Sequence, residues 1–244
     1  MSIFSKLTWT ELKLFGREPF SVIFTFAFPL VVLLVLIGSF EPDDTAFGGA
    51  RPSDYYLASY IGVVIGAVGL IVLPVHIAMY RERGILRRFR ASAVPAWAVI
   101  GAQMAVGLVT AVVGSLVLIV AGRLLYDAAL PELPFRVLGA FLLGTLTFLS
   151  VGFLLAVLAR NARAAQAIGM LLFFPMWLLS GAGPPPEVMG SGMRTVSDLL
   201  PLTYVVRAIQ DPWLGERSEP GQIVLLLALL VISAVIGLRL YRTA

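Results

Sequence analysis

Long runs of apolar residues without charge constrain the fold of this chain more than any other feature of its sequence. Residues 20–40 contain no charged side chain, and the run is about as long as the roughly 20 residues that a helix needs to cross the hydrocarbon core of a bilayer. Hydrophobic residues make up 59% of the chain and charged residues only 13%, against about a quarter charged in a soluble domain. We therefore expect an all-α membrane protein.

Six such runs predict six transmembrane helices, and the whole chain, residues 1–244, is expected to form a single transmembrane domain. Their approximate limits are 20–40, 55–79, 98–121, 137–159, 164–180 and 222–238. Pro29 predicts a kink in the first run, since proline removes a helical hydrogen bond. Residues 181–221 are too many for a plain connector, so two short half-helices are predicted there, at 186–199 and 202–214, re-entrant or lying on the outer surface.

A basic island at residues 81–94 separates the second run from the third. Its five arginines would cost about 12 kcal/mol or more at the centre of a bilayer, so the island must face water. On a helical wheel its apolar and basic side chains gather on different sides, which predicts a short amphipathic helix at the membrane surface. The island is either a topology signal alone or a docking surface for a cytosolic partner.

Residues 1–19 predict an N-terminal amphipathic helix at the membrane interface. Lys6, Lys13 and Arg17 share one side of the helical wheel, and apolar residues share another. Trp9 is typical of an interfacial anchor. Glu11 lies among the apolar residues and weakens the amphipathic pattern.

The distribution of basic residues predicts the orientation. Six spans place both termini on one side, and 12 of the 18 lysines and arginines fall on that side. The positive-inside rule therefore predicts a multi-pass protein with both termini in the cytoplasm.

Several kinds of chemistry have no residues to carry them. The chain has no cysteine, no recognisable metal site, and no lysine in a G-x-x-x-x-G-K-[ST] sequence, so no P-loop is expected to bind ATP. Nucleic-acid binding is not expected, because the basic residues sit at membrane edges. The predicted spans contain no Asp or Glu, which disfavours a proton-coupled transporter.

Polar residues within the spans leave two interpretations open. His76, the single histidine, is either a proton switch or a side chain hydrogen-bonded within the bundle. A further group either lines a transport path or only bridges helices: Ser59, Gln103, Thr110, Thr145 and Thr147.

Three stretches together resemble the permease subunits of ABC-2 type transporters, which include exporters of drugs, antibiotics, lipids and polysaccharides. The first combines Glu11 and Arg17-Glu18-Pro19 with Phe28-Pro29. The second, residues 82–92, is similar to the E-R-x-G-T-L-x-R-L loop of that family, with Ile85 where threonine is common and Pro95 slightly late. The third comprises Phe174-Pro175, Leu179-Ser180-Gly181 and Pro201-Leu202-Thr203-Tyr204 with Arg207.

The resemblance implies a permease of the bacterial inner membrane that binds no cofactor itself. It is expected to pair with two cytosolic ATPases, which hold the ATP and Mg, and with a second permease, as homodimer or heterodimer. The implied function is efflux of a hydrophobic or amphipathic small molecule, such as a drug, antibiotic or lipid. An ATP-independent channel or carrier, or a membrane scaffold, is the alternative. None of these is a catalytic activity of the chain itself.

The resemblance also assigns residues. A cytoplasmic coupling helix between spans two and three is expected to contact the ATPase through Glu82, Arg83, Gly84, Leu86, Arg87, Arg88, Phe89 and Arg90, flanked by Glu11 and Arg17 of the N-terminal helix. Spans two and five are expected to approach the second permease or border the path through Ala58, Gly62, Gly66, Phe173, Phe174 and Trp177. Lipid-facing aromatic side chains are an equally ordinary explanation for the last three.

Overall fold

The computed structural model describes residues 3–17, 19, 23–41, 47–85 and 95–243, and all regular structure in these residues is helical. This confirms the predicted all-α class for the described part of the chain. The elements in order are α1 (Ile3–Phe15), η1 (Ile23–Ala27), α3 (Phe28–Ile37), α4 (Pro52–Ala67), η3 (Val68–Val72), α5 (Leu73–Glu82), α7 (Ala96–Tyr126), α8 (Pro134–Leu158), α9 (Ala162–Leu179), η4 (Pro186–Val188), α10 (Ser191–Ser197), α11 (Pro201–Trp213) and α12 (Pro220–Thr243).

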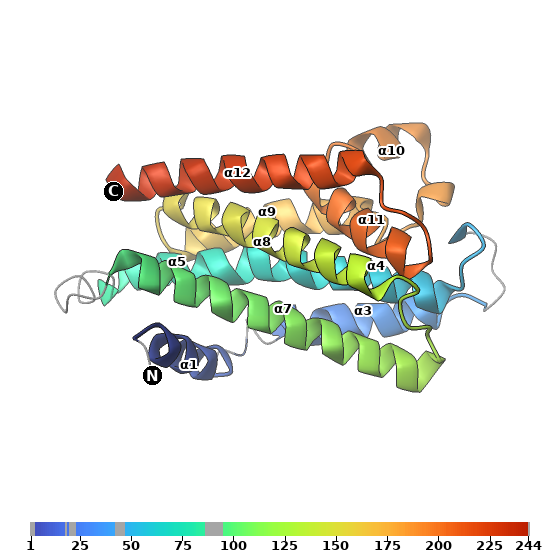
Figure 1. Cartoon of the computed structure of the whole chain (residues 1–244), viewed down its shortest axis with the longest axis horizontal. Coiled ribbons are helices and arrows are strands. Elements are labelled where there is room, and N and C mark those ends of the chain that lie inside the picture. Colours follow the sequence, from blue (N-terminus) through green and yellow to red (C-terminus); the bar gives the residue numbers. More distant parts are fainter. Residues whose placement is uncertain (1–2, 18, 20–22, 42–46, 86–94, 244) are drawn as a thin grey trace.

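The long helices run side by side as a bundle, and α1 lies apart from it, packed on α7 (Figure 1). The end of α5, the turn between α8 and α9, helix α1 and the end of α12 all lie at one end of the bundle, on the left in Figure 1. We call this the termini end. Helix α10 and the connection between α7 and α8 lie at the opposite end.

Five helices among the described residues are long and apolar enough to cross a membrane, which makes the chain a multi-pass membrane protein. They are Pro52–Glu82, Ala98–Tyr126, Pro134–Leu158, Ala162–Leu179 and Pro220–Tyr241, and each overlaps a predicted span. The first predicted span corresponds to the shorter apolar helix Thr25–Ile37. The count of six spans therefore stays a prediction.

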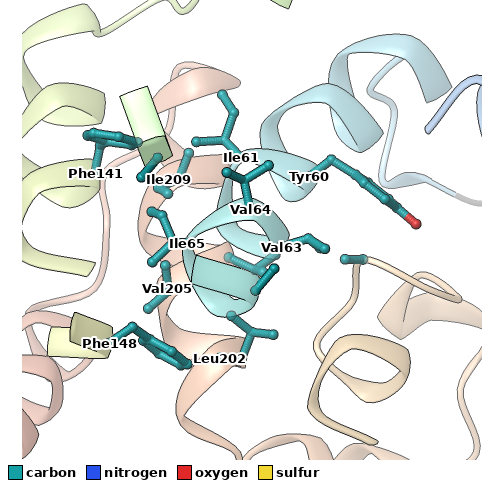
Figure 2. Packing of buried hydrophobic residues seen from close by; sticks show 14 of the residues in the cluster. Tyr60, Ile61, Val63, Val64, Ile65, Phe141, Phe148, Leu202, Val205 and Ile209 are labelled. Atoms are coloured by element: carbon teal, nitrogen blue, oxygen red, sulfur yellow. The ribbon is translucent and has the colours of Figure 1, made fainter. Parts of the chain in front are cut away.

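The second span is the centre of the bundle. Helices α4, η3 and α5 form one continuous span, and 94% of its most apolar 18-residue stretch is buried inside the protein. Figure 2 shows Ile61 and Ile65 of α4 beside Phe141 and Phe148 of α8 and Val205 of α11. Lipid is as apolar as these side chains, so the packing stabilises through close van der Waals contact rather than through removal of apolar surface from water.

Two prolines explain where the helices widen. The π-helical turns η1 and η3 end just before Pro29 and Pro74, each of which stands in the first turn of the next α-helix. A proline ring clashes with the carbonyl four residues earlier and has no N–H to bond it, and a wider turn relieves both problems. The disturbance predicted at Pro29 is found as η1.

The segment before α12 differs in part from its prediction. The first predicted half-helix, at 186–199, is split into η4 and α10. The second corresponds to α11, but α11 is not a surface helix: Leu202, Val205, Val206, Ala208 and Ile209 are completely buried. Its apolar face packs against α4 and α8, because those helices present glycines to it.

Candidate functional site

The buried carboxylate of Glu11 joins three helices at the termini end. Glu11 of α1 is only 6% exposed. Its Oε2 accepts a hydrogen bond of 2.5 Å from the hydroxyl of Tyr80 on α5 and one of 2.8 Å from the amide Nε2 of Gln103 on α7. Glu11, which disturbs the amphipathic pattern of α1, thus links this helix to α5 and α7.

A cavity of about 300 Å³ lies at this junction. Buried Glu11, Tyr80 and Gln103 line it together with the exposed side chains of Arg17 and Arg83. His76 also lines it, and its Nδ1 lies 3.0 Å from the carbonyl oxygen of Val72. The structure therefore brings together the two residues predicted in the N-terminal helix and the first residues of the basic island.

The last turn of α5 contains the first residues of the basic island. Glu82 accepts a hydrogen bond of 3.2 Å from the backbone N–H of Ala162, at the start of α9. Arg83 closes the helix, and Gly84 follows with φ of +68°, a left-handed conformation that glycine adopts without a steric penalty and that commonly ends helices. Gly84 thus ends α5 within the basic island, after the island's first three residues.

The other predicted coupling residues lie outside the described part of the chain. These are Leu86, Arg87, Arg88, Phe89 and Arg90. Their contact with an ATPase stays a prediction.

The predicted stripe of small residues on α4 is used inside the chain. Ala58, Gly62 and Gly66 are all buried. A Cβ on Gly62 would lie 2.9 Å from Val206 Cγ2, and one on Gly66 would lie 3.1 Å from Leu202 Cδ1. The two glycines of the stripe therefore admit α11 of the same chain. Contact of the stripe with a second permease or with a path stays a prediction.

The predicted aromatic group lies between the first and fifth apolar segments. The ring of Phe28 on α3 packs edge-to-face against Phe173, Phe174 and Trp177 of α9, at centroid distances of 6.3, 6.0 and 5.3 Å. Phe173 is buried, whereas Phe174 is 37% exposed. Trp177 also lines an apolar cavity of about 320 Å³ between α3 and the residues that follow α9.

Several polar span residues bridge helices. Ser59 on α4 accepts a hydrogen bond of 3.1 Å from Gln210 on α11, and Thr147 on α8 donates one of 3.2 Å to the carbonyl of Leu226 on α12. Gln103 bridges α7 to α1. For these three residues the structure supports the bridging interpretation.

The sequence did not single out an acidic cavity of about 480 Å³ at the opposite end of the bundle. Its lining carries one arginine, Arg51, and five carboxylates, from Asp54, Glu132, Glu187, Asp211 and Glu216. Burial raises the pKa of Asp211 above its usual range, against the opposing effect of a 3.0 Å hydrogen bond from Gln222. The concentration of acids between the predicted spans on that side was the available signal.

The sequence matches a family of known proteins over most of its length. Residues 3–212 match the family described as ABC-2 type transporter. The chain belongs to the ABC-2 type transporter family. The matched residues include α1, the basic island and the bundle as far as α11. They therefore include the residues predicted to face the ATPase and those predicted to face a second permease or the path. The chain is also similar to a Bacillus subtilis (strain 168) protein named "Putative transport permease YvfS", with 24% identity over 205 residues, 82% of this chain and 81% of the relative.

Proposed function

We propose that this chain is the membrane-spanning permease of an ATP-driven exporter and that a separate cytosolic ATPase supplies the energy. The observation that carries the proposal is the family match over residues 3–212, which includes the basic island between α5 and α7. Permeases of this family work with an ATPase partner, and five arginines in 10 residues at the end of a buried span offer a surface for acidic groups on such a partner.

The proposed substrate is a hydrophobic or amphipathic small molecule. The apolar cavity beside Trp177 supports this class, since its lining includes Val32, Leu36 and Phe40 from the first apolar segment and Leu178 from α9. Apolar cavities of roughly this size or larger are typical of small-molecule sites.

A second permease, identical or different, is the proposed partner within the membrane. Helix α9 is open to such a partner, since only 17% of its most apolar 18-residue stretch is buried, the same share as in α12 and far below the 94% of the central span. Leu171, Phe174 and Leu178 are exposed on it. The proposed interface is on α9, one of the two spans that the resemblance places there.

The proposed orientation places the termini end in the cytoplasm of a bacterial cell. That end comprises the N-terminal helix, residues 81–85 of the basic island, the α8–α9 turn with Arg160, Arg163 at the start of α9, and the end of α12. The excess of basic residues there supports the assignment.

The test is to co-express the chain with a P-loop ATPase encoded beside it, purify both together and measure ATP hydrolysis in lipid. We expect co-purification, and stimulation of hydrolysis by members of a panel of hydrophobic and amphipathic compounds. Reversal of charge at Arg87 and Arg88 to Glu is expected to abolish both.

The matched control is Arg217→Glu. Arg217 is an exposed arginine between α11 and α12, so its reversal changes the charge without touching the island, and association is expected to persist. Full association of the Arg87 and Arg88 variant would contradict the island as the docking surface. ATP-independent flux through the purified chain alone would favour a channel or carrier.

A further inference from the structure

Two consecutive residues at the end of α5 hold the two helix ends of the α8–α9 turn. Nη1 of Arg81 donates a hydrogen bond of 3.1 Å to the carbonyl of Val157, and its Nη2 donates to the carbonyl of Ala159. The next residue, Glu82, accepts from the N–H of Ala162 at 3.2 Å. Each of these hydrogen bonds joins the end of α5 to a residue 76 to 80 positions later in the sequence.

The charges match the two helix ends that they meet. The last carbonyls of a helix and its first N–H groups have no partner within the helix, and they carry partial negative and partial positive charge. Arg81 meets the carbonyl end of α8, and Glu82 meets the N–H end of α9. The order Arg-Glu is therefore favourable at both ends, and the order Glu-Arg would be unfavourable at both.

The turn itself is short and closely packed against α5. Only residues 159–161 separate α8 from α9, and the side chain of Asn161 caps α9 by accepting from the N–H of Ala164 at 2.7 Å. Behind these contacts Ala78, Ala159 and Ala165 form a buried cluster of small side chains. Small residues let the backbones approach closely, so the turn has little freedom to move independently of α5.

We propose that Arg81 and Glu82 are positioning residues that clamp the α8–α9 turn to the end of α5, so that displacement of the rest of the basic island carries α8 and α9 with it. The mechanical part of this proposal rests on the proposed function, since it needs an ATPase to move the island. The clamp gives spans four and five a direct mechanical connection to an island that follows span two in the sequence.

The first experiment needs no ATPase. The variant Arg81→Glu/Glu82→Arg keeps composition and net charge but reverses the match with both helix ends. We expect amide hydrogen exchange at residues 159–165 to become about tenfold faster, because hydrogen bonds to charged groups are lost. The comparison variant Tyr80→Phe breaks the neighbouring contact with Glu11 and is expected to leave exchange at 159–165 unchanged.

The second experiment uses the chain co-purified with its ATPase. In the natural protein, addition of ADP with vanadate is expected to change amide hydrogen exchange both in α5 and at the start of α9. In the reversed variant, only exchange in α5 is expected to change. If exchange at residues 159–165 without nucleotide were the same in the reversed variant as in the natural protein, the clamp would be overturned. Faster resting exchange with a normal response to nucleotide would overturn its role in transmission. Failure of the natural chain to bind any ATPase would instead contradict the proposed function, and the first experiment would still decide the clamp.

Discussion

The hydroxyl of Tyr80 and the carboxylate of Glu11 lie 2.5 Å apart, although 69 residues separate them in the sequence. This contact joins α1, which lies beside the bundle, to the central span. Tyr80 is followed directly by Arg81 and Glu82, so three consecutive side chains at the end of α5 reach α1, α8 and α9. Tyr80 and the first two residues of the basic island therefore connect the island to the rest of the molecule.

Replacement of Glu11 by alanine is expected to destabilise the protein by about 1–3 kcal/mol, because it removes the buried acceptor shared by Tyr80 and Gln103. Thermal unfolding of the purified protein in detergent measures the effect. Glu11→Gln is the matched control, since its amide oxygen can accept both hydrogen bonds, and it is expected to unfold close to the natural protein. Equal loss in both variants would show that the charge, rather than the acceptor, holds α1.

Glu11 illustrates what the sequence could and could not predict at this site. The helix was predictable from the spacing of its basic and apolar residues, and its place at the membrane interface stays a prediction. The partners of Glu11 were not, because Tyr80 and Gln103 come from two other helices and no periodic pattern links them. A carboxylate on the apolar side of an interfacial helix did carry information: burial of such a group requires nearby donors.

Replacement of Gly152 by alanine is expected to destabilise the bundle by about 1–3 kcal/mol through overpacking. Helices α8 and η3 meet backbone to backbone there, and a Cβ on Gly152 would lie 2.0 Å from the carbonyl oxygen of Gly69. Unfolding by denaturant measures the loss. Gly139 in the same helix has no atom within 4 Å of the position of a Cβ, so Gly139→Ala is expected to shift stability by no more than about 1 kcal/mol.

The glycines of α4 also show what the spacing of small residues can and cannot predict about helix contacts. Four-residue spacing of small side chains indicates that some helix approaches closely, and this part of the prediction agrees with the contact of Gly62 with Val206. The spacing cannot identify which helix approaches. Here α11, predicted as a re-entrant or surface half-helix, fills the position, because its buried face matches the groove that the α4 glycines leave.

Replacement of Asp211 by asparagine is expected to flatten the pH dependence of stability on the acid side. Burial raises the pKa of Asp211 in the folded protein, so the folded state binds this proton more tightly than the unfolded state. As pH rises from the usual carboxyl range through the raised value, stability therefore falls. Unfolding measured across this range should show a smaller fall in the variant than in the natural protein. Parallel pH profiles for the two proteins would contradict the assignment.

Labelling of single cysteines is expected to place the termini end in the cytoplasm. The chain contains no cysteine, so each introduced thiol reports on one position alone. Arg83 and Gly192 are both exposed, at opposite ends of the bundle, and Gly192 has open space around its Cα. A membrane-impermeant maleimide should label Gly192→Cys in intact cells and Arg83→Cys only after permeabilisation. If Arg83→Cys reacted in intact cells, the basic island would face the exterior, and no cytosolic ATPase could reach it.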